Sequence, residues 1–333
     1  MKTDNAAQID KLFAAIRAAG KVCVFPHIDP DGDTLGSSLA LQSLIRRMGR
    51  PVQIMLDGTP PERLSFMPGI ETIRDVAAVQ DCDALLAITV DVSAVERMGK
   101  AVEIFRKAPL TAQIDHHETN PEFAGINIID SDAPSSASIV FELFKALGLP
   151  LREDEATNLY IGLSTDTGNF QFKNTDAHSF RIMAELMEAG LNIGHYSRML
   201  FLRKDREHIA LLGKALPTFR YAAGGKVAGM VLDYETMQEI DPLGEYCEGI
   251  VNYALNVKGV RLAYLAREAQ KGSIKCSLRA LPPYRVDEVA LQFDGGGHRL
   301  AAGCTLHMTL KEAADTLERE LVKACAEADA LAK

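Results

Sequence analysis

The chain has 333 residues, of which 47% are hydrophobic and 24% are charged, and its formal net charge is −9. These values are typical of a soluble globular protein long enough for two domains. The net negative charge excludes a protein that coats long nucleic acid through a broad basic surface. We find no signal peptide and no apolar run of membrane-spanning length, so no membrane partner is expected. The six cysteines include no Cys-x-x-Cys pair, which favours reduced thiols and a cytoplasmic location.

The first segment with clear chemistry is a turn between a predicted strand at 22–25 and a predicted helix from Thr34 to about Met48. Seven residues of this turn contain one imidazole and three carboxylates, those of His27, Asp29, Asp31 and Asp33. Carboxylates this close repel one another unless a cation neutralises them, so the turn favours a metal site. A solvated Asp-rich turn that caps the helix would explain the same residues, and the turn alone does not decide between the two interpretations.

The next predicted strands also end on acidic residues or histidines. A strand at 84–90 is followed by Asp91, and a strand at 110–114 is followed by Asp115, His116 and His117. The apolar run at 84–90 is continuous, which fits a strand buried on both faces of a parallel sheet. Ligands gather at the carboxyl ends of the strands in such sheets. The recurrence therefore predicts one site at this edge and favours the metal interpretation.

The remaining elements of the N-terminal half alternate between strands and helices. Strands are expected at 52–56 and 126–129, and helices from Ser135 to about Leu147 and from about Glu153 to Leu163. The second helix runs into a Gly-containing turn that carries Asp166. The pattern predicts an α/β fold in which the N-terminal domain has a mainly parallel sheet flanked by helices.

Beyond Pro217 the sequence changes to the alternation of apolar and polar residues that is typical of strands. Hairpins are predicted over 219–232 and 260–279, and a final helix from Leu310 to about Leu331. We therefore expect a smaller C-terminal α/β domain with a mixed sheet. The expected boundaries are 1–190 for the first domain, 191–215 for a helical linker and 216–333 for the second domain.

Two features of the C-terminal half suit an anionic substrate. Residues 258–285 contain seven Lys and Arg and one acid, although such a patch can also serve solubility. Further on, Gly295, Gly296 and Gly297 precede His298. Consecutive glycines let backbone N–H groups approach a phosphate oxygen, and a helix predicted after them would add its N-terminal dipole.

Taken in order, these motifs resemble the DHH phosphoesterases, a family named for the triplet found here at 115–117. The resemblance covers essentially the whole chain and rests on His27-x-Asp29-Pro30-Asp31-Gly32-Asp33, Asp91, Asp115-His116-His117 and Thr165-Asp166-Thr167-Gly168. The Gly-Gly-Gly-His and Ala-Ala-Gly motifs resemble the DHH-associated domain of the oligoribonuclease branch that also acts on 3′-phosphoadenosine 5′-phosphate. That branch usually has four glycines, and Asp294 stands here at the first position, which leaves the detail of substrate selection open.

The resemblance implies hydrolysis of short oligoribonucleotides such as pApA to nucleoside 5′-monophosphates, of 3′-phosphoadenosine 5′-phosphate to AMP, or of both. It also implies two divalent metal ions, and Asp and His ligands without thiolate suit Mn²⁺. By resemblance, one ion is held by His27, Asp31 and Asp91, and the other by Asp33, Asp91, His116 and Asp166. A water between the ions would attack phosphorus, and His117 would contact the phosphate or protonate the leaving oxygen. Asp29 and Asp115 would orient the ligands.

The resemblance also implies that the second domain binds the rest of the substrate through Arg279, Gly295, Gly296, Gly297 and His298. The expected partners are short RNA oligonucleotides or small bisphosphorylated nucleotides, and a homodimer could form. Two alternatives stay open: a cyclic di-AMP phosphodiesterase, and a non-catalytic nucleotide-binding regulator. The complete set of ligand residues argues against the regulator.

Overall fold

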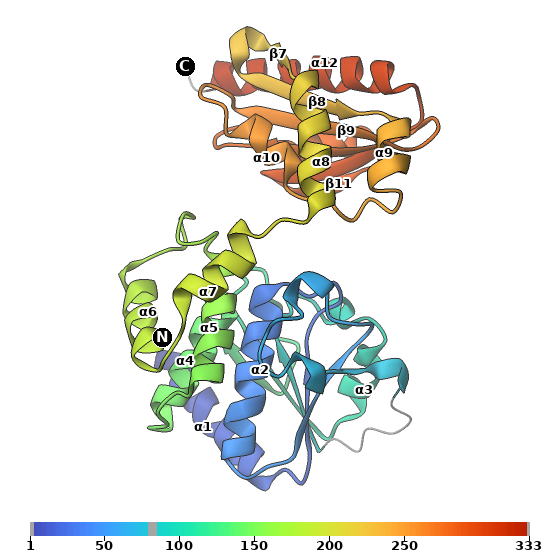
Figure 1. The fold of residues 1–333 in the computed structure, drawn as a ribbon. Coiled ribbons are helices and arrows are strands. Elements are labelled where there is room, and N and C mark those ends of the chain that lie inside the picture. The colour runs from blue at the N-terminus through green and yellow to red at the C-terminus, as the bar shows by residue number, and fades with distance from the viewer. Residues whose placement is uncertain (1–2, 79–84, 332–333) are drawn as a thin grey trace. The chain divides into compact units, whose positions relative to one another are not determined.

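The computed structural model describes residues 3–78 and 85–331, and the chain divides into two compact units, Met1–Arg203 and Lys204–Lys333 (Figure 1). Each unit has its own six-stranded sheet and its own buried apolar clusters. None of the helices in the described ranges combines the length and the apolar character needed to cross a bilayer. As expected, Cys247, Cys276, Cys304 and Cys325 carry free thiols, whereas Cys82 lies outside the described residues.

The first unit is built on a fully parallel sheet with the strand order β3-β2-β1-β4-β5-β6. Its strands are β1 (Val22–Phe25), β2 (Val52–Leu56), β3 (Arg74–Asp75), β4 (Leu86–Val90), β5 (Leu110–Asp115) and β6 (Ile126–Ile129). Every residue of β4 is buried, as predicted for a strand covered on both faces. Ala84, where this strand was expected to begin, lies outside the described residues. The predicted parallel sheet is confirmed.

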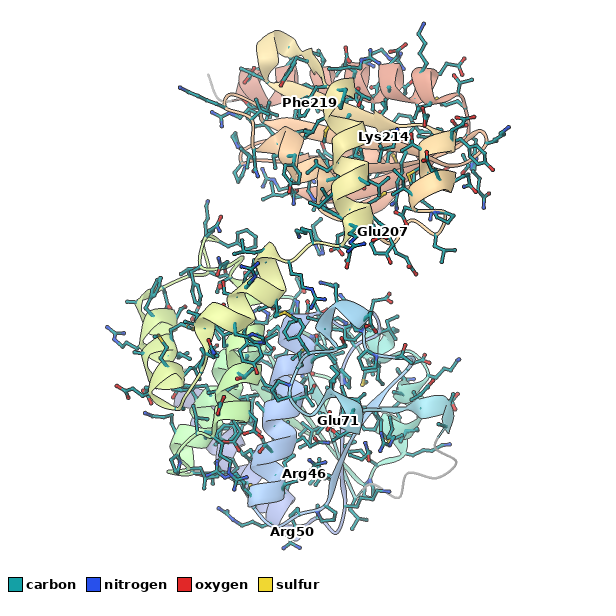
Figure 2. The ribbon with its side chains drawn as sticks, in the orientation of Figure 1. Arg46, Arg50, Glu71, Glu207, Lys214 and Phe219 are labelled. Carbon is teal, nitrogen blue, oxygen red and sulfur yellow. The ribbon has the colours of Figure 1, made fainter. Side chains whose placement is uncertain are left out.

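Helices flank this sheet (Figure 1). They are α1 (Thr3–Ala18), α2 (Gly32–Arg47), α3 (Ala101–Lys107), α4 (Ser136–Ala146), α5 (Glu153–Asp166), α6 (Ala177–Glu188) and α7 (Ile193–Ser197), with short 3₁₀ turns at Glu62–Leu64, Ile70–Thr72, Val76–Ala78 and Val95–Met98. Asp31 caps α2 by accepting hydrogen bonds from the backbone amides of Asp33 and Thr34, both at 3.0 Å. Arg46, labelled in Figure 2, lies in the last turn of α2. A positive charge at this end of a helix interacts favourably with the helix dipole.

Helix α5 is longer than the sequence predicts, because it ends at Asp166 instead of Leu163. The hydroxyls of Thr165 and Thr167 donate to the carbonyl oxygens of Ile161 and Leu163, at 2.8 and 2.6 Å. Each hydroxyl thus bonds to the carbonyl four positions back, and the Thr167 amide also donates to the carbonyl oxygen of Leu163, at 3.1 Å. Asp166 is the last residue of this helix and not part of a free turn.

The second unit contains a mixed sheet with the order β11-β12-β10-β9-β8-β7, in which only β8 and β9 pair in parallel. The strands are β7 (Arg220–Ala222), β8 (Val227–Leu232), β9 (Leu262–Gln270), β10 (Ser273–Ala280), β11 (Gly296–His298) and β12 (Ala301–Leu306). The helices are α8 (Arg206–Ala215), α9 (Tyr234–Ile240), α10 (Ile250–Leu255), α11 (Asp287–Leu291) and α12 (Leu310–Leu331), with 3₁₀ turns at Leu216–Thr218 and Ala223–Gly225. The predicted mixed sheet and both predicted hairpins are confirmed.

The segment 191–215, predicted as a helical linker, consists of successive short helical segments. It contains α7, a π-helical stretch at Arg198–Leu202 and then α8. Leu211 and Ala215 of α8 are buried in an apolar cluster of the second unit. The change from one unit to the next falls at Arg203 and Lys204, inside the predicted linker.

The prediction of a helix after the glycine run is wrong. Gly296–His298 form strand β11, which pairs antiparallel with β12. The glycines allow these two strands to approach closely. A Cβ on Gly295 would lie 2.3 Å from the carbonyl oxygen of Gly303, and a Cβ on Gly297 would lie 2.6 Å from that of Ala301. The segment after the glycines therefore offers no helix N-terminus to this loop, since Ala301–Leu306 form strand β12.

Candidate metal centre

The carboxyl ends of β1, β4 and β5, which are neighbours in the parallel sheet, carry the predicted ligands. The turn after β1 leads into α2, Asp91 directly follows β4, and the DHH triplet begins at the last residue of β5. Helix α5 adds Asp166 at its own carboxyl end. The structure thus brings all of the predicted metal ligands together, from segments up to 139 positions apart (27 to 166).

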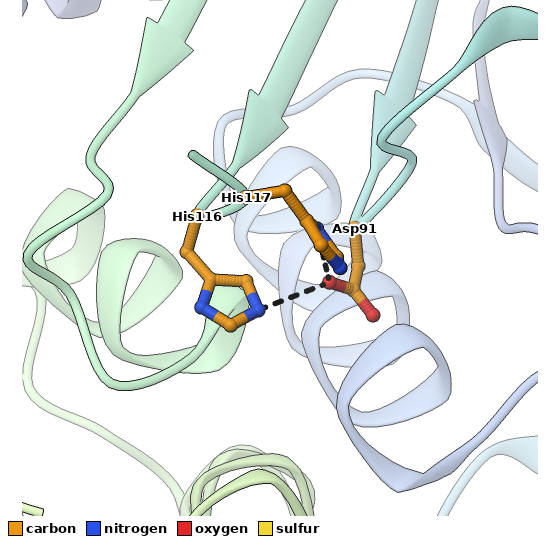
Figure 3. A group of neighbouring side chains, drawn as sticks. All are labelled: Asp91, His116 and His117. Carbon is orange, nitrogen blue, oxygen red and sulfur yellow. Dashed lines mark ion pairs between the residues drawn. The ribbon is translucent and has the colours of Figure 1, made fainter. Parts of the chain in front are cut away.

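The ligand atoms form three overlapping groups, and within each group they all lie within 4.8 Å of one another. The groups are His27 with Asp31 and Asp91, Asp33 with His116 and Asp166, and Asp91 with His116 and His117. Figure 3 shows the third group, in which His116 and His117 both point at the Asp91 carboxylate. Asp91 and His116 each belong to two groups, so Asp91 can face a cation on the His27 side and another on the His116 side.

Asp91 is held in a fixed orientation. Its backbone has a left-handed φ of +61°, which is uncommon for a residue with a side chain. Thr34 Oγ1 donates to its Oδ2 at 2.6 Å, and Ser136 Oγ donates to its Oδ1 at 3.1 Å. The carboxylate is thereby anchored by α2 and α4 at once, with 4% of the residue exposed.

Asp33 is anchored by backbone groups at the beginning of α4. The amides of Ser136 and Ala137 donate to its two carboxylate oxygens at 2.7 and 2.8 Å. Such N–H groups and the positive end of the helix dipole stabilise a negative charge. These bonds favour the ionised form of Asp33 and oppose the effect of its burial.

Two histidines present their Nε2 atoms to the carboxylates. His27 Nδ1 lies 2.6 Å from the carbonyl oxygen of Ile28, and His116 Nδ1 lies 3.3 Å from that of Ala133. A carbonyl oxygen can only accept, so each of these contacts requires a proton on Nδ1 and leaves Nε2 with its lone pair. At His27 the Arg97 guanidinium, which can only donate, lies 3.3 Å from the same Nδ1, farther away than the carbonyl oxygen. His116 Nε2 lies 3.3 Å from Asp166 Oδ2 and 3.6 Å from Asp91 Oδ1. This arrangement is typical of metal-binding histidines.

His117 differs from the other two histidines because its Nδ1 contacts a carboxylate. It lies 2.7 Å from Asp115 Oδ1, while Asn120 Nδ2 donates to Asp115 Oδ2 at 2.6 Å. The hydrogen bond to Asp115 raises the pKa of His117, against the effect of partial burial. Burial alone would raise the pKa of Asp115, but the bonds from His117 and Asn120 outweigh it and the pKa is lowered. With 39% of its side chain exposed, His117 is open to a substrate.

Three carboxyls of the centre carry raised pKa values. Burial, followed by repulsion from Asp91 and other carboxylates, holds the pKa of Asp33 well above its usual range. Burial and the charge of Asp31 raise the pKa of Asp91 to about 6. Burial also raises the pKa of Asp166, against the attraction of His116. Negative charges are thus crowded into a buried space, which a bound cation would relieve. The donor set fits divalent metal ions.

Asp29 takes no part in the three groups found among the described residues. It is exposed and has a left-handed φ of +51°. Asp115, in contrast, contacts His117 directly. The predicted role of Asp115 in orienting a neighbour has a geometric basis, while Asp29 shows no comparable contact among the hydrogen bonds described here.

Several residues that the sequence analysis did not select contribute to the centre. Thr34, Ser136 and Asn120 hold the carboxylates, and Arg97 places a guanidinium nitrogen 3.3 Å from His27 Nδ1. Thr34 directly follows the acidic turn and Asn120 lies five residues after Asp115, so both were close to motifs that the sequence shows. The contacts of Ser136 and Arg97 join residues 45 and 70 positions apart and have no counterpart in local sequence patterns.

The predicted substrate residues lie in the second unit. The register of β10, β12 and β11 pairs Arg279 with Ala301 and Ala301 with His298. Residues in one row across a sheet share a face, so Arg279 and His298 project from the same side. His298 is exposed, whereas partial burial lowers the pKa of Arg279. Together with Gly295, Gly296 and Gly297, they form one end of this sheet.

Comparisons with known proteins agree with this architecture. A model described as "DHH family, N-terminal domain" matches residues 21–163, and a DHHA1 domain model matches residues 234–327. The chain is 31% identical over 287 residues to a Thermus thermophilus protein named bifunctional oligoribonuclease and PAP phosphatase NrnA, covering 86% of this chain and 84% of that protein. It is 23% identical over 320 residues to a Bacillus subtilis protein of the same name, covering 95% and 98%.

Among solved structures, an exopolyphosphatase-related protein from Bacteroides fragilis superimposes with a TM-score of 0.87 and 27% identity, over 96% of each chain. The two matched models follow each other along the chain in the same order as the two units of the structure. The chain belongs to the DHH family and carries a DHHA1 domain after its DHH domain.

Proposed function

We propose that this protein is a metal-dependent phosphoesterase that hydrolyses short oligoribonucleotides to nucleoside 5′-monophosphates and 3′-phosphoadenosine 5′-phosphate to AMP. The observation that supports it best is the set of three ligand groups that share Asp91 and His116. The names of the Thermus and Bacillus relatives point to the same two activities. Dinucleotides such as pApA belong to the same substrate class.

The chain offers ligands for two divalent ions, and their Asp and His character suits Mn²⁺. His27, Asp31 and Asp91 would hold one ion, and Asp33, Asp91, His116 and Asp166 the other. When bound, such ions neutralise phosphoryl oxygens and make water a better nucleophile at neutral pH. The chain itself supplies the fixed carboxylates and the two imidazoles with outward Nε2 lone pairs.

His117 would act on the substrate directly. Because its Nδ1 bonds to Asp115, its other ring nitrogen is available to the scissile phosphate or to the leaving oxygen. Asp115 and Asn120 fix the ring in this orientation. We assign His117 as the group that contacts the phosphate or protonates the leaving oxygen. Asp91 would be essential as the carboxylate common to both ions.

The second unit would bind the part of the substrate that does not react. Arg279 and His298 offer cationic or hydrogen-bonding groups on one face of the sheet, and Gly295, Gly296 and Gly297 offer a backbone without side chains. A second phosphate or a terminal nucleotide is the ligand class that suits them.

The test is a comparison of kcat/KM for short RNAs, pApA and 3′-phosphoadenosine 5′-phosphate with Mn²⁺, Mg²⁺ or a chelator. Cyclic di-AMP and pyrophosphate are the controls. We expect turnover of the linear nucleotides with Mn²⁺ and none with the chelator. Turnover of cyclic di-AMP alone would support the cyclic dinucleotide phosphodiesterase, and no turnover with any divalent metal would support the regulator.

The assignment of Asp91 is tested with Asp91→Asn, for which we expect loss of turnover and weaker Mn²⁺ binding by calorimetry. Asp29→Asn is the matched control, because asparagine also tolerates the left-handed φ at that position. Near-normal activity of Asp91→Asn would refute the proposed ligand set.

A further inference from the structure

The loop that leaves α5 carries an exposed aromatic ring next to a predicted metal ligand. Phe172 is 60% exposed, yet its ring lies against the chain: a Cβ added to Gly168 would be 2.4 Å from Phe172 Cζ. Gly168 is two residues beyond Asp166. The ring therefore covers the turn that directly follows the metal centre and leaves its outer face open.

Hydrogen bonds hold this loop in one conformation. The carbonyl oxygen of Thr167 accepts from the amides of Gln171 and Phe172, both at 3.0 Å. Asn174 Nδ2 donates to the carbonyl oxygens of Asp166, at 3.1 Å, and Pro134, at 2.9 Å. Asn174 thus ties the end of the loop back to the residue that carries the Asp166 ligand.

The backbone of the loop also adopts an uncommon conformation. Gly168, Asn169 and Phe170 have consecutive left-handed φ values of +57°, +56° and +63°. For a bulky residue such as phenylalanine this conformation is strained, and such strain persists only where the surrounding structure enforces it. The loop therefore holds its side chains in fixed positions, in addition to connecting α5 with α6.

The neighbouring aromatic residues have structural roles that Phe172 lacks. Phe170 packs against the core of the first unit, and the Phe180 ring lies 5.3 Å from it at an angle of 34°. Phe172 takes no part in these contacts. Single exposed apolar side chains are common and need no explanation. A rigidly held ring beside a phosphoester site is different, because nucleotide substrates bring a flat base with them.

We propose that Phe172 is a stacking platform for the nucleobase of the nucleotide whose phosphate reacts; this proposal rests on the proposed function. A pre-oriented ring loses little conformational entropy when a base stacks on it. Stacking tolerates any base, because every base has a π-face. The platform would therefore distinguish nucleotides from phosphate compounds without a base, such as pyrophosphate, and would not distinguish one base from another.

The test uses Phe172→Ala and Phe172→Tyr with two substrates, pApA and an analogue of pApA in which both bases are absent. Phe172→Ala should raise KM for pApA about tenfold and leave kcat within about twofold. It should not change KM for the abasic analogue, and Phe172→Tyr should behave like the wild type on both. Met187→Ala is the matched control, because Met187 is also exposed in the first unit and lies on α6.

Each contrary outcome is distinct. Equal changes of KM for pApA and for the abasic analogue would assign Phe172 a structural role and overturn the platform. A change of oligomeric state without any dependence on the base would assign the ring to an interface between copies. If wild type hydrolyses pApA and Phe172→Ala has an unchanged KM, only the platform fails. If wild type hydrolyses neither substrate with any divalent metal, the proposed function fails as well.

Discussion

At the scale of single residues, hydroxyl groups outside the sequence motifs orient the proposed metal ligands. Thr34 Oγ1 donates to Asp91 at 2.6 Å inside the protein, and a hydrogen bond to a charged group contributes about 1.5–3 kcal/mol. We predict that Thr34→Val, which keeps the shape of the side chain, lowers kcat at least tenfold because Asp91 loses its orientation. Steady-state kinetics with pApA measure this effect.

Ser38 provides the control for Thr34 on the same helix. Its hydroxyl is buried and has no hydrogen-bond partner among the described residues. Ser38→Ala should therefore leave kcat unchanged. If both variants lose activity to the same degree, the loss comes from disturbed packing of α2 and not from the bond to Asp91.

Removal of the metal should expose the repulsion among the same carboxylates. The pKa of Asp91 is about 6 in the folded protein against 3.8 ordinarily. A raised folded-state pKa means that the folded state holds the proton more tightly than the unfolded state. The stability that this carboxyl contributes is therefore fully present below about pH 4 and is lost as the pH rises through about 6. With about 1.4 kcal/mol per pKa unit, the expected loss is about 3 kcal/mol.

We therefore predict that the chelated protein has a lower Tm at pH 8 than at pH 5, and that Mn²⁺ raises Tm at pH 8. Asp91→Asn should remove the part of this pH dependence that the Asp91 carboxyl contributes, while Asp33 and Asp166, whose pKa values are also raised, keep their own parts. Thermal unfolding followed by circular dichroism measures all three cases. A chelated Asp91→Asn protein with the pH profile of the wild type would contradict the assignment.

At the scale of elements, the site depends on helices that approach one another unusually closely. A Cβ on Gly36 in α2 would lie 2.3 Å from the carbonyl oxygen of Asn158 and 3.0 Å from the amide nitrogen of Gly162, both in α5. These are backbone atoms, so the whole helix would have to move. We predict that Gly36→Ala destabilises the protein by about 1–3 kcal/mol, measured by urea unfolding.

Gly213 in α8 is the matched control for Gly36. It also lies within a helix, but nothing stands within 4 Å of the position that a Cβ would take. Gly213→Ala should be neutral or stabilising by up to about 1 kcal/mol, because alanine favours the helix. Equal destabilisation by both substitutions would show that packing of α2 on α5 is not the cause.

The same elements show what sequence patterns can predict. Apolar runs and acidic strand ends predicted the parallel sheet and the edge where the ligands meet, because both follow from local periodicity and chain order. The extension of α5 to Asp166 covers Ser164, Thr165 and Asp166, polar residues that continue no apolar periodicity. Strand β11 forms only because β12 lies beside it. Contacts such as that of the Ser136 amide with Asp33 join residues 103 positions apart, and no local pattern encodes them.

At the scale of the whole molecule, the proposed roles follow the division into two units. All proposed metal ligands, His117 and the proposed stacking residue Phe172 lie in Met1–Arg203, and the residues proposed to bind the part of the substrate that does not react lie in Lys204–Lys333. Changes in the second unit should therefore affect substrate binding more than the chemical step. Kinetic constants separate these two effects, since loss of binding raises KM and loss of transition-state stabilisation lowers kcat.

His298 provides the sharpest test of this division. It is exposed and lies in one row with Arg279, and it belongs to none of the ligand groups found among the described residues. His298→Ala should raise KM for 3′-phosphoadenosine 5′-phosphate about tenfold and leave kcat within about twofold. His307→Ala is the control, because His307 is also exposed but lies beyond the other end of β12. A fall in kcat with unchanged KM in His298→Ala would place this residue in the chemical step and contradict the division.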